Sequence, residues 1–342
     1  MIQILEYCEL CVFFLFLTSL RIKHGSFAEK ETKMRKPYHI CMSGGDELIC
    51  RSEEDYFRLF NCIALAAYET DSVLLADAEM SSHVHLCVRT ESPDVFMSRA
   101  WLMYTRYFNK RYKRHGRLGE EEPFVLELDG LYHILAAICY ILRNPLHHGV
   151  SSTPFGYPFS SANAYFRKEL GKWLDEEPLP KKSYYRCLPR LSSYPEGYRM
   201  SGSGVYVRES VIDVAEVERM FVTPRSFLYC MNRLSSEEWT AEQEKDMSSR
   251  PSVTLEVIEG GVGLHTLDKM LLNENGRMNY KAMSDIGLCA IIDKQLVPAI
   301  GKTSVYEMTA REVSDALRYL RQTYHVNESQ ARRCLAFSYA RQ

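Results

Sequence analysis

The stretch HVHLCVR at residues 83–89 places an apolar side chain at every second position. Because successive side chains of a β-strand point to opposite faces, this pattern predicts a strand whose valine and leucine side chains face a core. His83 and His85 then stand on the other face, about 6 to 7 Å apart along the strand. Two neutral imidazoles at that spacing can hold one divalent metal ion. A surface strand with two polar histidines is the alternative interpretation.

A helix is expected over residues 131–144, LYHILAAICYILRN. A step of about 100° per residue gathers its apolar side chains into one stripe. The stripe consists of Leu131, Ile134, Leu135, Ile138, Ile141 and Leu142. Tyr140 falls on the opposite side, with Asn144 one turn further along at i+4. Pro145 disfavours helical conformation in the residue before it, so we expect the helix to end at Asn144. An exposed tyrosine, or one that packs against the sheet, would show the same pattern.

Strands and helices alternate over residues 38–144 in an order that indicates the fold class. Ser52 and the acidic residues after it predict one helix start, and Ser92 with Pro93 predicts another. Strands are expected at 38–42, 72–78, 83–89 and 124–128, and helices from residue 53, at 93–114 and at 131–144. The order predicts an α+β fold: a ferredoxin-like sandwich in which an antiparallel sheet has helices on one face, with one additional helix.

The helix expected at 93–114 carries cations without any acidic residue between positions 99 and 117. These cations are Arg99, Arg106, Lys110, Arg111, Lys113, Arg114 and Arg117. Tyrosines are interleaved with them, so the surface can hold a phosphate backbone while bases stack on the rings. Uncompensated like charge along one helix costs stability unless an anion is expected. We therefore favour a DNA surface over a solvated helix face, and expect Trp101 and Phe108 to lie in the core.

Three motifs in this order resemble the HUH-type single-tyrosine transposases, particularly the REP-associated group. They are HVH at 83–85, YTRYFNKRY at 104–112 and YILRNP at 140–145. RKPYH at 35–39 also resembles the usual opening of that domain. The resemblance covers about residues 35–166, and the three motifs together are far more specific than any one of them.

The resemblance implies a DNA strand transferase that cleaves and rejoins single-stranded DNA. Tyr140 would attack the phosphodiester and leave a 5′-phosphotyrosine with a free 3′-hydroxyl. His83 and His85 would hold Mg²⁺ or Mn²⁺, with Asn144 as a third, weaker ligand. Imidazole ligands favour Mn²⁺ over Mg²⁺. The expected partner is single-stranded or hairpin DNA, bound by a monomer or a homodimer.

Two departures from the family pattern leave other functions open. Ser81-Ser82 replaces the Pro-Asn that normally precedes the first histidine, and GEEEP at 119–123 replaces a basic segment in an expected DNA-facing loop. The acidic loop favours an alternative function, a non-catalytic DNA-hairpin-binding protein derived from a transposase. A zinc hydrolase built on the two histidines lacks an obvious third strong ligand, and is the least favoured reading.

Composition gives little global signal about partners. The chain has 342 residues, 46% hydrophobic and 12% aromatic, which is enough for two packed domains. Its net charge of -2 means that any DNA affinity must come from local clusters of cations. The 11 cysteines are an odd, scattered set that suits free thiols in a reducing cytosol, so we expect a cytoplasmic protein.

The N-terminal region contains an apolar run at residues 10–17 that is too short to cross a membrane. Glu6 and Glu9 stand where a signal peptide needs positive charge. Residues 1–33 are therefore expected to be a poorly constrained tail, and a membrane anchor is the less favoured interpretation.

Proline-rich sequence after residue 166 predicts a boundary, with the transposase-like domain at 34–166 and a mostly helical C-terminal region at 167–342. Thr309 to Glu312 forms a capping box, and two helices follow around a short turn at 325–327. This shape at 309–337 predicts a helix-turn-helix, although plain helical domains contain similar pairs. Its recognition helix would present Gln330, Arg332 and Arg333 to DNA.

Overall fold

The computed structural model describes residues 34–172, 178–191, 194–232 and 283–341. The expected tail at residues 1–33 lies outside this part of the chain. The cysteines within the described ranges are free thiols, as the sequence predicted. No helix in those ranges is both long enough and apolar enough to span a bilayer.

Four strands form one antiparallel sheet, each close to its expected position. They are β1 (Lys36–Ser43), β2 (Val73–Glu79), β3 (His83–Thr90) and β4 (Phe124–Glu127), in the order β2-β3-β1-β4. In the β1–β3 pair His39 lies opposite Cys87, and Cys41 lies opposite His85. Directly opposed residues share a face of the sheet, so the two histidines of β3 and His39 of β1 lie on the same face.

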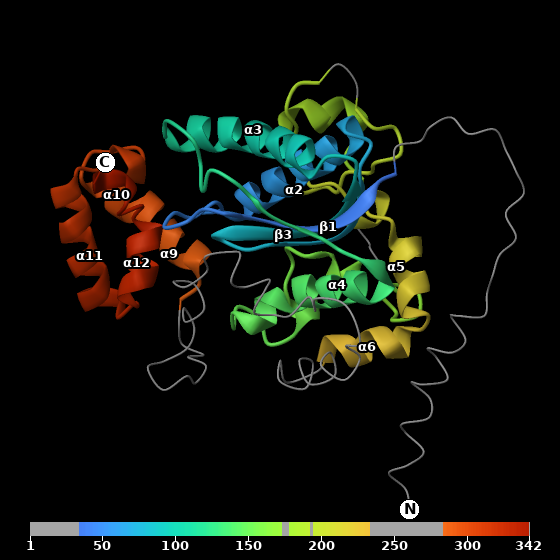
Figure 1. Cartoon of the computed structure of the whole chain (residues 1–342). Coiled ribbons are helices and arrows are strands. Elements are labelled where there is room, and N and C mark those ends of the chain that lie inside the picture. The colour runs from blue at the N-terminus through green and yellow to red at the C-terminus, as the bar shows by residue number, and fades with distance from the viewer. Residues whose placement is uncertain (1–33, 173–177, 192–193, 233–282, 342) are drawn as a thin grey trace, which may run out of the picture. The chain divides into compact units, whose positions relative to one another are not determined.

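Helices cover both faces of the sheet, not one face as expected. Helices α2 (Glu53–Glu69) and α3 (Pro93–Tyr112) lie on one side, and α4 (Gly130–His147) lies on the other (Figure 1). The reason is visible in β3, where Val84 and Leu86 on one face and His83 and His85 on the other are all at most 1% exposed. A strand buried on both faces needs a covering layer on each. The fold class is α+β, as predicted.

The predicted helix starts are confirmed, whereas one predicted helix end is wrong. Ser52 and Asp55 form a capping box at the start of α2, and Pro93 occupies the first turn of α3. Helix α4, however, continues through Pro145 to His147. Because Pro145 lies in the last turn, its missing N–H removes one backbone hydrogen bond only, and the amide of His148 still bonds to the carbonyl of Asn144.

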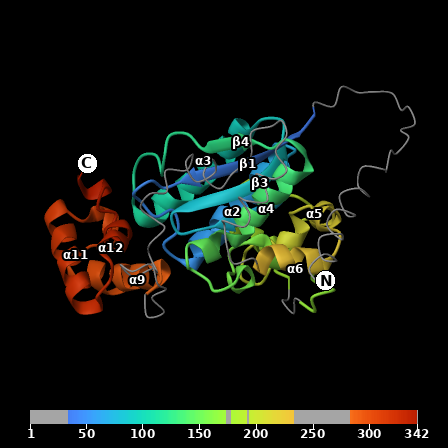
Figure 2. The same cartoon turned by 60° about the horizontal axis from the view of Figure 1, so that its bottom comes forward.

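The chain after α4 packs against the same layers through short helices. These are η1 (Pro154–Gly156), η2 (Ser161–Asn163), η3 (Lys181–Arg186), η4 (Arg208–Ser210), α5 (Val214–Phe221) and α6 (Pro224–Asn232). Helices α5 and α6 lie beside α4 (Figure 2). Single bridges join Ile212 to Leu74 and Ser160 to Ala78, so this segment extends the β2 edge of the sheet.

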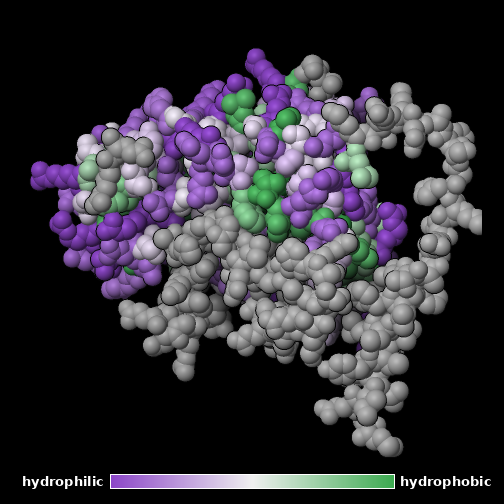
Figure 3. Space-filling view, viewed as in Figure 1, coloured by the Kyte–Doolittle hydropathy of each residue, from purple (hydrophilic) through white to green (hydrophobic). Residues whose placement is uncertain are grey.

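The C-terminal part of the described chain consists of helices. They are α9 (Asp285–Ile291), the π-helix η5 (Ile292–Leu296), α10 (Val297–Ala299), η6 (Val305–Glu307), α11 (Ala310–Tyr324), α12 (Glu328–Cys334) and η7 (Tyr339–Arg341). The surface over these helices and over α3 is mostly hydrophilic (Figure 3).

One buried arginine joins the C-terminal helices to the sheet domain. The Arg51 guanidinium has no exposed side-chain surface and lies 2.6 Å from an Asp293 carboxylate oxygen. The same group donates to the carbonyl of Cys334 at 2.7 Å. The chain from Arg35 onward forms one compact unit. The predicted division at residue 166 stays a prediction.

Candidate functional site

Strand β3 and helix α4 bring two histidines and one tyrosine together. The ring centroids of His83 and His85 lie 4.9 Å apart on the strand face that α4 covers. The ring of Tyr140 stands edge-on to His85, with 5.2 Å between centroids and 87° between ring planes. Tyr140 is 8% exposed, so it faces the sheet and not open solvent. The alternation of β3 and the helical step of α4 thus place the three predicted site residues side by side.

Asn144 lies one turn beyond Tyr140 and reaches the other histidine. Its side-chain oxygen is 3.2 Å from Nε2 of His83, and the hydroxyl of Ser82 is 3.1 Å from Nδ1 of the same ring. His148, one more turn along, places its ring centroid 5.3 Å from that of His83. His148 was not among the predicted site residues, although its i+4 spacing from Asn144 places it one turn further along the same side.

Two residues of β1 complete the surroundings of His85. Nε2 of His39 lies 3.0 Å from Nδ1 of His85, and the thiol sulfur of Cys41 lies 4.0 Å from Nε2 of His85. Neither β1 residue was predicted as part of the site. Their alternation within the strand was readable, but which strand would pair with β3, and in which register, was not.

His39 and His85 carry neutral imidazoles because both are buried. Burial lowers the pKa of His39 to about 3. Burial also lowers the pKa of His85 well below its usual range, and the nearby imidazoles of His83, His39 and His148 add to that effect. Burial raises the pKa of the Cys41 thiol well above its usual value, with a further contribution from Glu120. At neutral pH the rings of His39 and His85 therefore offer lone pairs, and Cys41 remains a thiol.

These residues fit a divalent metal ion in composition. Within the described ranges no group of three or more His, Cys, Asp and Glu side chains could hold a metal. The predicted set instead combines His83 and His85 with the amide of Asn144. Adjacent ligands of an octahedral ion with bonds of about 2.1 Å lie about 3 Å apart. The 3.2 Å between His83 Nε2 and Asn144 Oδ1 is close to that spacing, and is here a hydrogen bond in which the imidazole N–H donates to the amide oxygen.

The interpretation of residues 99–117 as an uncompensated cationic face is wrong for four cations, two on α3 and two directly after it. Arg99 and Arg111 pair with Glu69 and Glu54 of α2, Lys113 pairs with Glu307 of η6, and Arg114 pairs with Glu47. The acids come from other segments of the chain, so the local sequence did not reveal them. Trp101 and Phe108 are buried, as expected.

Two cations of α3 remain available on the surface. Arg106 and Lys110 are exposed, and neither forms an ion pair within the part of the chain that the structure describes. Helix α3 covers the face of the sheet opposite to α4, so these cations and Tyr140 lie on opposite sides of the sheet (Figure 1).

The helix pair at the C-terminus forms, but two of its expected recognition residues point inward. His325 ends α11 in the left-handed conformation, and Asn327 caps α12. Gln330 is 2% exposed and donates to Asp285 at 2.9 Å, and Arg333 is also buried. Because α12 packs against α9, its inner face is unavailable to DNA. Arg332 pairs with Glu328 on its own helix and stays partly exposed.

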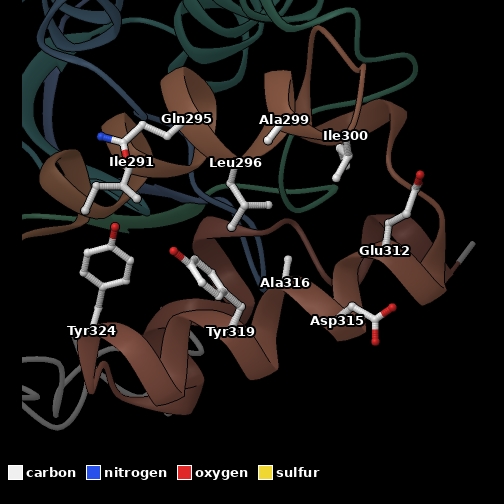
Figure 4. Close-up of a pocket in the computed structure, with 10 residues that line it drawn as sticks. All are labelled: Ile291, Gln295, Leu296, Ala299, Ile300, Glu312, Asp315, Ala316, Tyr319 and Tyr324. Atoms are coloured by element: carbon white, nitrogen blue, oxygen red, sulfur yellow. The ribbon is translucent and has the colours of Figure 1, made fainter.

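A cavity of about 390 Å³ lies between the segment 291–300 and helix α11. Leu296, Ile300, Ala316, Tyr319 and Tyr324 supply most of its apolar lining (Figure 4). None of the predicted site residues contributes to it.

No family model and no curated protein matches this chain. A solved structure of a REP-associated tyrosine transposase bound to a REP hairpin is similar over 44% of this chain and 93% of that chain. The identity is 15% and the TM-score is 0.32, so the likeness is weak.

Proposed function

We propose that this chain is a metal-dependent single-tyrosine DNA strand transferase, related to HUH-type transposases. The main support is that side chains of β3 and α4 meet. Asn144 contacts His83, and Tyr140 stands edge-on to His85. The strand order β4-β1-β3-β2 also supports a ferredoxin-like fold, which the motif resemblance implies.

Tyr140 is the nucleophile in this proposal. Its hydroxyl oxygen attacks the phosphorus of a single-stranded DNA phosphodiester, the bond from phosphorus to the 3′ oxygen breaks, and the 3′ oxygen leaves as a hydroxyl. The 5′ phosphate stays on the tyrosine. A phenol with a pKa of about 10 is a better leaving group than an alcohol, so the reverse attack by a 3′-hydroxyl can rejoin the strand.

His83, His85 and Asn144 hold the metal ion in this proposal. When bound, Mg²⁺ or Mn²⁺ polarises a phosphoryl oxygen of the scissile phosphate. Asn144 and Tyr140 share one face of α4, so the helix aligns the nucleophile with the ligand set. The neutral rings of His39 and His85 suit a cation, because an imidazolium at either position would repel it.

DNA affinity in this proposal comes from exposed cations that form no ion pair with an acidic side chain. Arg106 and Lys110 are the α3 residues that meet this condition within the described ranges. They would contact the backbone of single-stranded or hairpin DNA without reading its sequence.

A second candidate function is a DNA-hairpin-binding protein that does not cut. The burial of the site favours it, since Tyr140 is 8% exposed and His85 is fully buried. A scissile phosphate can reach the tyrosine only if the site opens. Cleavage therefore separates the two candidates.

The test is covalent trapping of DNA. The full chain is incubated with Mn²⁺ and a hairpin-bearing single strand from the DNA that flanks its gene, and the products are separated under denaturing conditions. Wild type is expected to form a protein–DNA adduct that survives denaturation. Tyr140→Phe removes one hydroxyl, so it is expected to lose the adduct while DNA binding persists.

Tyr132→Phe is the matched control, because Tyr132 lies on the same helix about 80° away around its axis. It is expected to form the adduct at the wild-type level. An adduct in Tyr140→Phe would assign the nucleophile to another residue. DNA binding without any adduct from wild type would favour the non-catalytic function.

A further inference from the structure

The segment around η3 carries a cluster of cations on the surface of the protein. Residues 178–195 contain four cations and no acidic residue. The cations are Lys181, Lys182, Arg186 and Arg190. All four side chains are exposed, and none forms an ion pair within the ranges that the structure describes. The cluster therefore presents unneutralised positive charge to solvent.

Two buried side chains of the same segment fix the direction in which η3 faces. Tyr184 and Leu188, four residues apart, are both buried. The ring of Tyr184 stands edge-on to that of Tyr206, with 6.2 Å between centroids and 86° between planes. The side-chain amide of Asn61 on α2 donates to the carbonyl of Cys187 at 3.4 Å. These contacts hold η3 against α2 and leave its cations in water.

Tyr185 stands among these cations and is the most exposed tyrosine of the described chain, at 61%. Its hydroxyl accepts a hydrogen bond from Nε of Arg186 at 3.1 Å, and Cζ of Arg186 lies 5.6 Å from the ring centroid. One exposed tyrosine needs no explanation by itself. Here, however, a ring and a guanidinium are held together. An aromatic ring on which an unpaired base stacks, beside cations that hold the phosphates, is the arrangement with which proteins bind single strands without reading their sequence.

Arg58 of α2 connects η3 with α3. Its guanidinium donates to the carbonyl of Arg186 and lies 5.2 Å from the ring centroid of Tyr107 on α3. Helices α2 and α3 and the yellow-green η3 thus lie on the same side of the sheet, opposite to α4 (Figure 1). Glu54 pairs with both Arg58 and Arg111, so the junction itself carries little net charge. The unpaired cations lie on either side of it.

We propose that η3 and the exposed cations of α3 form one binding surface for single-stranded DNA, with Tyr185 as the side chain on which a base stacks. Arg106 and Lys110 contribute the α3 part, next to Tyr107 in the sequence. Because this surface and Tyr140 lie on opposite sides of the sheet, the surface holds a part of the strand other than the phosphate at the candidate site. Binding here needs neither metal nor cleavage and so goes beyond the proposed function, on which only the choice of DNA over RNA rests.

The first measurement tests Tyr185 by fluorescence anisotropy of the full chain with labelled oligo(dT), a strand that does not fold, in the absence of Mn²⁺. Tyr185→Ala is expected to weaken binding about 5- to 100-fold, because it removes the stacking ring. Tyr185→Phe keeps the ring and is the matched control, with affinity expected within about twofold of wild type. An oligo(dA)–oligo(dT) duplex, whose bases are already stacked, is expected to bind equally well to wild type and Tyr185→Ala.

The second measurement tests the cations of η3 across a salt series. Replacement of both Lys181 and Lys182 by glutamine is expected to lower the slope of log affinity against log salt by about 1.4, if each contacts one phosphate. The control is replacement of both Lys36 and Arg318 by glutamine. It removes the same charge, but these exposed cations pair with Glu127 and Asp315, so the slope is expected to change less.

Wild-type affinity in Tyr185→Ala would overturn the proposal, as would an equal loss of duplex binding in that variant. Equal changes of slope in the two lysine-containing double variants would show an effect of net charge alone. An unchanged slope in the η3 variant would show that its lysines are only solvated, or that the acidic residues at 175–177, outside the described ranges, neutralise them.

An oligo(U) strand is titrated in parallel, and tighter binding of this RNA than of oligo(dT) would overturn the choice of DNA. Failure of the proposed function looks different. If wild type forms no covalent adduct, but Tyr185→Ala and the η3 double variant change oligo(dT) binding as expected, the binding surface stands and the strand-transfer function fails.

Discussion

The side-chain oxygen of Asn144 lies 3.2 Å from Nε2 of His83, although 61 residues separate the two in the sequence. This contact ties the last turn of α4 to the first residue of β3. Both side chains are buried, so water does not compete for the interaction. Because Tyr140 lies one turn earlier on α4, the same contact fixes the register between the proposed nucleophile and the histidine pair.

Asn144→Ala is expected to weaken Mn²⁺ binding about 10-fold or more, because it removes a proposed ligand and frees the His83 ring to turn. Titration calorimetry measures the change. Asn61→Ala is the matched control, since Asn61 is also fully buried and donates to the carbonyl of Gly204 at 2.8 Å. That control is expected to lower the free energy of unfolding by about 1 to 3 kcal/mol and leave Mn²⁺ affinity unchanged. Equal affinity in Asn144→Ala and wild type would remove Asn144 from the ligand set.

Replacement of both Arg106 and Lys110 by glutamine is expected to weaken single-stranded DNA binding and to flatten its salt dependence. If each side chain contacts one phosphate, the slope of log affinity against log salt falls by about 1.4. Fluorescence anisotropy across a salt series measures the slope. Arg99→Gln is the control, because Arg99 already pairs with Glu69 and is expected to change the slope less. An unchanged slope in the double variant would mean that this face of α3 is only solvated.

Arg51→Ala is expected to lower the free energy of unfolding by about 3 kcal/mol, as removal of one partner from a buried ion pair does. The figure is at the lower end of that range because the Asp293 side chain keeps 28% exposure and can be rehydrated. Urea denaturation measures the change. Arg318→Ala breaks an exposed pair with Asp315 and is expected to cost less than about 0.5 kcal/mol. Similar losses in the two variants would contradict the role of Arg51 as the anchor of the C-terminal helices.

The buried carboxyl of Glu79 is expected to make stability depend on pH. Burial raises the pKa of Glu79 well above its usual range, neighbouring Asp77 raises it further, and Arg208 opposes both effects. The folded protein therefore keeps a proton that the unfolded chain releases at about pH 4.3. The contribution of Glu79 to the free energy of unfolding is fully present below that pH and is lost as pH rises through the folded pKa.

Glu79→Gln measures this dependence, because glutamine resembles the protonated carboxyl and does not titrate. We subtract the free energy of unfolding of the variant from that of wild type. This difference is expected to be largest at acidic pH and to decrease as pH rises. Urea denaturation of both proteins at several pH values gives the difference. A difference that grows with pH would show that Glu79 is charged in the folded state and stabilised by Arg208.

Local patterns predicted the secondary structure well where apolar and polar residues alternate or where helix caps are strong. The alternation in β3 and the capping box at Ser52 were sufficient, because each depends on residues a few positions apart. The end of α4 was mispredicted, since a proline in the last turn removes one hydrogen bond only and packing over the helix outweighs that loss. The layer formed by α4 was not predicted, because the polar histidines on one face of β3 suggested that this face was exposed to solvent.

Residue spacing alone predicts that His83 and His85 share one strand face and that Tyr140 and Asn144 share one helix face, because each pair follows from the repeat of a single element. That these faces meet and that His39 reaches His85 depends on how distant segments pack. The same packing pairs Arg99, Arg111, Lys113 and Arg114 with distant acids and turns Gln330 and Arg333 inward. No local pattern contains this information, because strand pairing, register and charge compensation arise from contacts between segments far apart in the chain.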